Sequence, residues 1–313
     1  MKKYFNIIFM GTPDFAVPSL NALHKNDYGV SLVVTQPDRP KGRGRKVVSP
    51  PVKEAAQRFG YDIIQPLSAK DKDFFDTLSG LKPDMFIVVA YGHILSKNIL
   101  SIPVTGAINL HASLLPKYRG PAPIQWAIIN EEKQTGVTTM LMDEGMDTGD
   151  ILLSSKEKIT PVDTSATLHD RLAVLGADLL IKTLKSFETK NLTPIAQDHA
   201  IATYAPLLTK GDGRIIWGKT AENIASLIRG VTPWPGAFTF QDKKRLKILS
   251  AQPILVEFNE APGTVIKSFP DELRIATGKG ALSIKEIQGA SGKRLLIKDF
   301  LMGNQMPPGT VLH

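Results

Sequence analysis

The residue types best suited to chemistry lie in one stretch of the chain, Asn109 to Pro123. Asn109 and His111 follow an apolar run that predicts a buried strand over residues 106–110. In an extended chain, side chains two residues apart point to the same side, so the amide and the imidazole should face one cavity. Such a pair fits acyl transfer, in which one group donates to an oxyanion and the other moves a proton. Taken alone, however, it is more typical of a hydrogen-bonded structural histidine at a strand end.

An acidic, glycine-punctuated loop at 143–150 is the second candidate for chemistry. It follows a predicted strand over residues 137–142 and contains Asp143, Glu144, Asp147 and Asp150. The spacing lacks the alternating ligands and the terminal glutamate of an EF-hand calcium loop. An ordinary turn remains open, and the more useful interpretation is a single carboxylate that reaches His111 or a reacting amine.

The elements that must position these residues predict an α/β domain with a mostly parallel sheet. Apolar runs at 4–10, 30–35 and 84–90 are typical of buried parallel strands, and helical segments separate them. Gly11 is the one glycine of the first turn, so the three-glycine dinucleotide fingerprint is missing. Ligands of such sheets bind at the carboxyl ends of strands. Tyr91, Gly92 and Ile94 are therefore predicted to line a pocket, and His93 to lie at the surface.

A second ligand-binding signal is the run from Gln36 to Lys46, which contains a single acid, Asp38. Its cations are Arg39, Lys41, Arg43, Arg45 and Lys46. Gly42, Gly44 and two prolines predict a loop without regular structure. The composition favours binding of a nucleic-acid backbone over a merely solvated surface loop.

The last third of the chain has a different pattern. A polar stretch at 191–209 predicts a linker, and residues 210–313 contain one helix near 221–230 and short β-rich runs between glycine turns. The predicted strands are 237–241, 245–251, 263–268, 272–276, 281–287 and 294–299. Such spacing is typical of a small barrel, a fold that often binds oligonucleotides. Residues 207–313 hold 15 Lys and Arg against 9 Asp and Glu, which agrees with an anionic partner.

Whole-chain properties set the remaining bounds. The 313 residues predict two domains, with residues 1–190 as the first, and the net charge is +8. The absence of cysteine excludes disulfides, thiolate catalysis and Cys-ligated zinc. No apolar run is long enough to span a membrane, and the N-terminus has no signal-peptide pattern. We therefore expect a cytoplasmic protein, and a monomer by default.

Together these motifs resemble the folate-dependent formyltransferases, and among them the enzymes that act on initiator methionyl-tRNA. The resemblance rests on Asn109-x-His111, Ser113-Leu-Leu-Pro116 and Asp147, and extends to Gly11–Phe15, Gln36–Arg39, Val89–Gly92 and Pro233–Pro235. It implies a Rossmann-like catalytic domain followed by an OB-like barrel. It also implies 10-formyltetrahydrofolate as the formyl donor, the amine of initiator methionyl-tRNA as the acceptor, and no metal.

The resemblance assigns roles to particular residues. Asn109, His111 and Asp147 become the catalytic trio. Ser113, Leu114, Leu115 and Pro116 become folate contacts, with a cis peptide expected before Pro116. The basic run becomes the tRNA-binding loop, with Arg43 its critical cation.

Three alternatives stay open. A formyltransferase acting on an amino sugar nucleotide could share the trio and a barrel, but has little use for the basic loop. A purine-pathway formyltransferase would not need residues 210–313. A non-catalytic RNA-binding protein would leave the trio unexplained.

Overall fold

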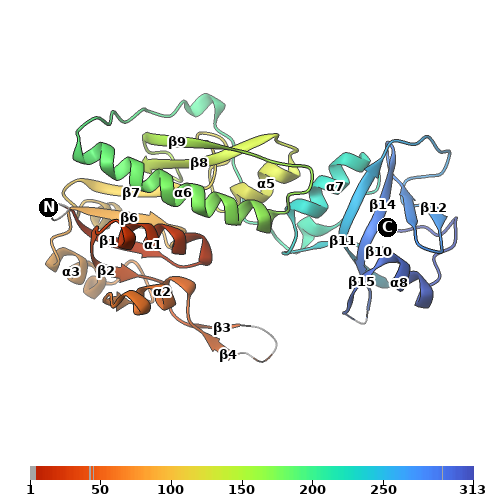
Figure 1. Ribbon diagram of the computed structural model, residues 1–313, viewed down its shortest axis with the longest axis horizontal. Helices are drawn as coiled ribbons and strands as arrows, with labels where there is room; N and C mark the ends of the chain where they lie inside the picture. The colour runs from red at the N-terminus through yellow and green to blue at the C-terminus, as the bar shows by residue number, and fades with distance from the viewer. Residues whose placement is uncertain (1–4, 42–43, 45, 291) are drawn as a thin grey trace. The chain divides into compact units, whose positions relative to one another are not determined.

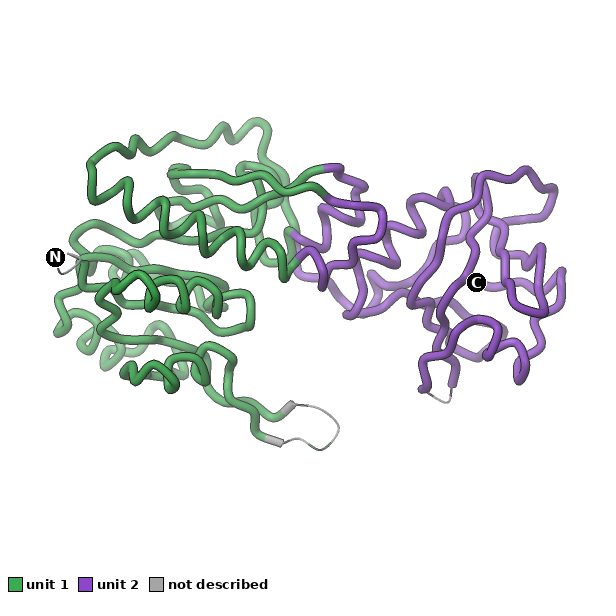
Figure 2. Tube along the Cα trace, viewed as in Figure 1, with its two compact units in different colours: residues 1–123, 134–158, 169–205 green, residues 124–133, 159–168, 206–313 purple. Residues whose placement is uncertain are grey.

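The computed structural model describes residues 5–41, 44, 46–290 and 292–313. The chain forms two compact units (Figures 1 and 2). Unit 1 comprises residues 1–123, 134–158 and 169–205, and unit 2 comprises residues 124–133, 159–168 and 206–313. Among the described residues, no helix is long and apolar enough to cross a membrane.

Unit 1 is built on a seven-stranded sheet with the order β5-β2-β1-β6-β7-β8-β9. The first five strands of that order run parallel, and β8 runs antiparallel to both of its neighbours, β7 and β9. The strands are β1 (Asn6–Gly11), β2 (Gly29–Val34), β5 (Ile63–Ile64), β6 (Met85–Val89), β7 (Gly106–His111), β8 (Gln134–Leu141) and β9 (Ile151–Lys158). Strands β1 and β6 are almost continuously apolar because both faces of the sheet are covered.

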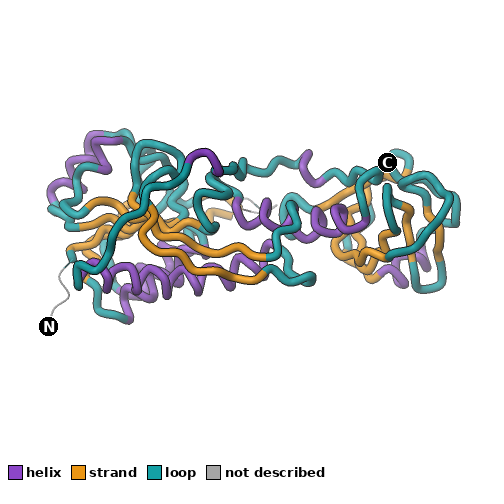
Figure 3. Tube along the Cα trace, turned by 90° about the horizontal axis from the view of Figure 1, so that it is seen from above, coloured by secondary structure: helices purple, strands orange, loops and turns teal. Residues whose placement is uncertain are grey.

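Helices lie on both sides of this sheet (Figure 3). They are η1 (Asp14–Ala16), α1 (Val17–Lys25), α2 (Pro51–Phe59), α3 (Lys72–Gly80), α4 (Lys97–Leu100) and α6 (Ser165–Glu188). Phe74 and Leu78 of α3 share one core cluster with Met10 and Phe86 of the sheet. Helix α6 packs on another part of the sheet, where an added Cβ at Gly176 would lie 2.7 Å from Leu110. Strand β7 therefore lies inside the sheet between β6 and β8, with helices packed over the sheet.

Unit 2 is a closed antiparallel barrel with added helices. The strand order is β10-β11-β14-β13-β12, and β15 pairs with β14. The backbone of His313 exchanges hydrogen bonds with Phe240 on β10, and Thr310 and Leu312 pair with the segment around β12, so residues 310–313 close the barrel. The strands are β10 (Ala237–Gln241), β11 (Lys244–Ile254), β12 (Val265–Ser268), β13 (Leu273–Ala276), β14 (Ala281–Gln288) and β15 (Arg294–Leu296). The helices of this part of the chain are α5 (Pro123–Ile129), η3 (Gly211–Gly213), α7 (Ala221–Gly230) and α8 (Ile297–Gly303).

The predicted fold class, an α/β domain with a mostly parallel sheet followed by a β-rich domain, is confirmed. Two details of the prediction are wrong. The basic run is not irregular, because Arg39–Lys41 (β3) and Lys46–Val48 (β4) pair as an antiparallel hairpin. Pro40 is tolerated there because the hairpin forms a separate two-stranded sheet without a central strand. The last predicted strand ends at Leu296, and residues 297–303 form helix α8 instead.

The segment predicted as a linker, 191–209, is packed rather than free. Ile195 bridges to Ile151 and Tyr204 bridges to Arg119 through backbone hydrogen bonds. A short 3-10 helix, η2 (His199–Ile201), lies between them. Residues up to Ala205 therefore lie with unit 1.

Candidate active site

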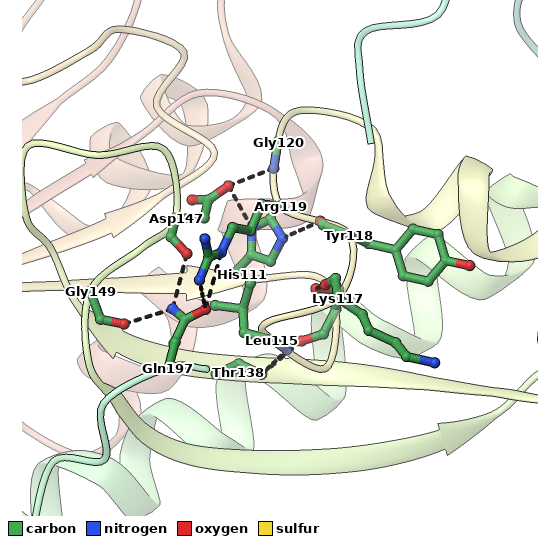
Figure 4. A network of polar contacts seen from close by, with 11 residues as sticks. His111, Leu115, Lys117, Tyr118, Arg119, Gly120, Thr138, Asp147, Gly149 and Gln197 are labelled. Carbon is green, nitrogen blue, oxygen red and sulfur yellow. Dashed lines mark hydrogen bonds and ion pairs between the residues drawn. The ribbon is translucent and has the colours of Figure 1, made fainter. Parts of the chain in front are cut away.

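His111 is the last residue of β7 and is almost fully buried, with 7% of its surface exposed. Its Nε2 lies 3.0 Å from the carbonyl oxygen of Tyr118. Because a carbonyl oxygen can only accept, Nε2 carries a hydrogen and donates it. The other ring nitrogen, Nδ1, faces Oδ2 of Asp147 at 3.6 Å (Figure 4). Neighbouring backbone thus fixes both the orientation and the tautomer of the ring.

Asp147 lies in the loop between β8 and β9 and carries the carboxylate that His111 faces. Its Oδ2 accepts a hydrogen bond of 2.7 Å from the backbone N–H of Gly120. The backbone of Asp147 adopts a left-handed conformation, with φ of 54°. That conformation is uncommon for a residue with a side chain, so contacts of the surrounding loop must hold it.

The route by which Asp147 reaches His111 does not follow from strand order. β8 runs antiparallel to β7, and its last residue, Leu141, pairs with Ile108 rather than with His111. The following loop must therefore fold back along β7 before Asp147 meets the imidazole. The sequence predicted a carboxylate of this loop as the partner of His111, but not this path.

The predicted partner Asn109 lies two residues before His111 on the same strand and is half-buried. It pairs with Val88 of β6 and Met140 of β8. Side chains two residues apart in a strand share a face, so Asn109 and His111 lie on one side of the sheet.

The Ser113–Pro116 turn is held by its own hydrogen bonds and by β8. Ser113 is fully buried, and its hydroxyl donates to the carbonyl of Lys117 at 2.6 Å. The backbone N–H of Leu115 donates to Thr138, and Leu114 packs against Gly136 of β8. The peptide before Pro116 is cis, as expected. The turn fixes the path from His111 to Tyr118.

A cleft of about 490 Å³ opens at the carboxyl ends of β1, β2 and β6. Tyr91 and Gly92 line it as predicted, whereas Ile94 does not and is 87% exposed. Burial raises the pKa of Tyr91 to about 12, so its phenol stays neutral and belongs to the core rather than to acid–base chemistry. His93, predicted at the surface or at a helix start, is half-buried and also lines the cleft. β6 and β7 are parallel neighbours, so the cleft and His111 lie at the same edge of the sheet.

The basic hairpin begins at this cleft. Arg39 lines it and donates to the side-chain oxygen of Gln36 at 2.6 Å. At the foot of the hairpin, Asp38 accepts hydrogen bonds from Lys53 and from Gln65, both at 2.8 Å. The ammonium of Lys53 and the amide of Gln65 hold the pKa of Asp38 below its usual value. Arg43 and Arg45 lie outside the described residues, as do the side chains of Lys41 and Lys46.

In the part of the chain that the structure describes, no group of three or more His, Cys, Asp or Glu residues could hold a metal ion. The chemistry of the site is that of an imidazole, a carboxylate and an amide at the edge of a parallel sheet. These groups suit proton transfer and stabilisation of an oxyanion.

Known proteins match the chain across both units. Residues 5–184 match the family model described as formyl transferase, and residues 207–305 match that of the formyl transferase C-terminal domain. A methionyl-tRNA formyltransferase of Caldanaerobacter subterraneus subsp. tengcongensis is 51% identical over 98% of this chain and 99% of its own length. One from Desulforamulus reducens is 50% identical over 98% of this chain and 97% of its own length.

The chain belongs to the methionyl-tRNA formyltransferase family. Solved structures share the formyltransferase fold at lower identity. An N-formyltransferase from Helicobacter canadensis, solved with folinic acid and dTDP-3-aminofucose, aligns over 90% of this chain and 98% of its own, with a TM-score of 0.66 and 20% identity. A methionyl-tRNA formyltransferase from Clostridium thermocellum aligns over 80% of this chain and 93% of its own, with a TM-score of 0.55 and 19% identity.

Two residues without a predicted role, Arg119 and Gln197, also lie at the site. Both belong to the hydrogen-bond network around the Asp147 loop (Figure 4). Arg119 lies in the proline-rich loop after His111, and Gln197 lies in the segment predicted as a linker. A lone arginine in a loop is ordinarily a solvated cation. Only its burial, which the sequence does not reveal, distinguishes Arg119 from such a residue.

Proposed function

We propose that this chain transfers the formyl group of 10-formyltetrahydrofolate to the α-amino group of initiator methionyl-tRNA. Relatives named methionyl-tRNA formyltransferase are about 50% identical to this chain over nearly the full length of both sequences, which supports this acceptor. The observation that carries the chemistry is the His111–Asp147 pair, with Nδ1 and Oδ2 3.6 Å apart and Nε2 occupied by Tyr118. The reaction belongs in the cytoplasm, and a monomer suffices for it.

The residues of the site divide the work as follows. The α-amine must be neutral to attack the formyl carbon, and its unperturbed pKa is roughly 7.7–8.0. Attack creates a tetrahedral oxyanion, to which the Asn109 amide and protonated Nδ1 of His111 donate. Asp147 stabilises the imidazolium and receives the amine proton directly or through water. His111 then returns a proton to the leaving nitrogen of the folate, so no covalent enzyme intermediate is needed.

The donor and the acceptor would meet at the carboxyl ends of the parallel strands, where the cleft opens. We assign the folate to Tyr91, Gly92 and the Ser113–Pro116 turn. In this turn the backbone shape matters more than the Ser113 hydroxyl, because that hydroxyl already donates to Lys117. Ile94 is exposed and does not line the cleft, so it would contact only a part of the folate that extends out of the cleft. Arg39 lines the same cleft at the foot of the basic hairpin, so the tRNA would approach from that side.

For the two parts of the chain we propose the roles implied by the family. The domain of residues 1–190 carries catalysis, and the barrel of residues 210–313 binds the tRNA. Within the basic run, Lys41, Arg43, Arg45 and Lys46 would contact phosphates, because a cluster of cations suits a nucleic-acid backbone.

Formyl transfer to three acceptors tests the proposal: initiator methionyl-tRNA, elongator methionyl-tRNA and a sugar-nucleotide amine. We expect efficient transfer to the initiator species and little to the other two. Transfer confined to the sugar nucleotide, which the structural neighbour from Helicobacter canadensis makes the main competitor, would overturn it.

A further inference from the structure

Arg119 is among the largest fully buried side chains in the described part of the chain, with 1% of its surface exposed. Its Nε and Nη2 donate to Oε1 of Gln197 at 3.2 and 2.7 Å, and Nη1 lies 3.2 Å from Nδ1 of His199. Neither of these partners is an acid. Burying a guanidinium is costly even when it is hydrogen-bonded, so a stability role alone is a poor explanation for it.

Arg119 determines which way the amide of Gln197 points. A guanidinium can only donate, so it must face the amide oxygen. The amide nitrogen is thereby directed at two backbone carbonyls, those of Asp147 at 2.9 Å and Gly149 at 2.7 Å. These carbonyls lie on either side of Thr148, in the turn where Asp147 adopts its left-handed conformation.

The segment from Tyr118 to Gly120, which contains Arg119, contacts both His111 and Asp147. The carbonyl of Tyr118 accepts from His111, and the N–H of Gly120 donates to Asp147. Between them, the backbone of Arg119 pairs with Thr203 and Ala205 at 2.8 and 2.7 Å. Because the loop after β8 must fold back to reach His111, a contact from outside the loop is needed to hold its turn.

We propose that Arg119 and Gln197 are positioning residues that hold the Asp147 turn, and thus its carboxylate, against His111. The inference rests on the proposed function for its kinetic part. Arg119 orients the amide, and the amide clamps the two carbonyls of the turn (Figure 4). Neither residue touches the reacting atoms in this scheme.

Gln197→Glu is the most informative variant. A carboxylate in that position still accepts from Arg119, so the buried contact is kept or strengthened. It can no longer donate to the carbonyls of Asp147 and Gly149. We expect kcat to fall about 10- to 100-fold, as for a small displacement of a catalytic group, with KM for both substrates and Tm nearly unchanged.

Arg119 is tested by a pair of variants. Arg119→Lys retains a cationic donor for Gln197 and should recover much of the kcat that Arg119→Met loses. Thr183→Val is the matched control, because Thr183 is also fully buried and hydrogen-bonded in unit 1, but to Thr139 of β8. This control should lower Tm without lowering kcat.

Crystal structures of the wild type and Gln197→Glu supply a readout that does not depend on activity. We expect the Asp147 Oδ2 to His111 Nδ1 separation to grow beyond its 3.6 Å in the variant. An unmoved carboxylate with full kcat would overturn the proposal. The proposal would also be overturned if kcat of Gln197→Glu fell together with its Tm and the Thr183→Val control showed the same joint fall. A wild type that formylates no methionyl-tRNA would refute the proposed function alone, since the structural comparison would still decide the positioning role.

Discussion

At the scale of single residues, His111 has its two ring nitrogens committed to different partners. The Tyr118 carbonyl occupies Nε2, and Nδ1 is left for Asp147 and the reacting atoms. Asp147 is in turn anchored by Gly120, which leaves its second carboxylate oxygen for a proton or a water molecule. We therefore propose that transfer depends on the charge of Asp147 rather than on its shape.

Asp147→Asn tests that dependence. The amide keeps an oxygen for the Gly120 N–H but cannot accept the amine proton. We expect kcat for methionyl-tRNA to fall about 10²- to 10⁴-fold, the usual range for loss of a general base, with Tm unchanged. Steady-state kinetics and thermal melting measure both. Asp170→Asn, an exposed carboxylate on α6 beside His169, serves as control, and equal activity of the two variants would contradict the role of Asp147.

How much of the site the sequence could predict is decided by sequence distance. Asn109 and His111 lie two residues apart on one strand, and this spacing alone was sufficient to predict that their side chains share a face. Asp147 was found through its loop composition and the family motif. Gln197 lies 78 residues from Arg119 and 50 from Asp147, and no local pattern marks a contact of that range.

At the scale of elements, the basic hairpin is anchored by a polar cluster at its foot. Asp38 precedes β3 and Ser49 follows β4, and the two are hydrogen-bonded to each other. Lys53 of α2 and Gln65 complete the cluster through the Asp38 carboxylate. This cluster therefore ties both ends of the hairpin to α2 and to Gln65.

The Asp38 cluster predicts a pH dependence of stability. Because contacts with Lys53 and Gln65 lower the pKa of Asp38 from its ordinary 3.8, folding favours the ionised form. The stabilisation is therefore present above pH 3.8 and is lost as pH falls through the lower folded pKa. The Tm difference between wild type and Asp38→Asn should be constant between about pH 5 and 7 and shrink below about pH 4. A difference that does not change with pH would show that Asp38 acts only as a hydrogen-bonding spacer.

Arg43→Ala tests the hairpin as a phosphate-binding element. Loss of one phosphate contact should weaken tRNA binding and reduce the slope of log affinity against log salt by about one. Folate binding should stay intact. Filter binding at several salt concentrations measures the slope, with Arg58→Ala on the exposed side of α2 as control. A loss of folate affinity in Arg43→Ala would refute this division of labour.

Element boundaries were predicted well where burial sets the pattern and poorly where it does not. The strands predicted at 84–90 and 106–110 appear almost unshifted as β6 and β7. Both lie inside a sheet that is covered on its two faces, so burial sets their apolar runs. The hairpin at 39–48 was missed because glycine and proline also occur in the turn and edge of a small exposed ribbon. Helix α8 was missed because only seven residues continue directly from a strand.

At the scale of the whole molecule, the barrel concentrates positive charge. Residues 207–313 contribute an excess of six cations to a net charge of +8. Arg245 of β11 lies over the ring of the buried Phe238 of β10, 3.9 Å from its centroid, so this contact ties two barrel strands together. An excess of cations of this kind favours sequence-independent binding of a nucleic-acid backbone.

A Lys243→Ala, Lys247→Ala double variant examines the barrel's share of binding. We expect weaker affinity for initiator and elongator tRNA alike, with a reduced salt dependence and an unchanged kcat at saturating tRNA. Lys70→Ala, Lys72→Ala on unit 1 removes the same charge and serves as control. Unchanged tRNA affinity in the barrel variant would mean that these lysines form only a solvated face.

The central claim is direct formyl transfer at the His111–Asp147 pair to initiator methionyl-tRNA, and rapid-quench transfer of a labelled formyl group tests it most directly. Enzyme is mixed with labelled 10-formyltetrahydrofolate, first alone and then with initiator methionyl-tRNA. We predict that label moves from folate to the methionyl amine only when both substrates are present, and that none becomes attached to the protein. Stable label on the protein after mixing with donor alone would contradict the account.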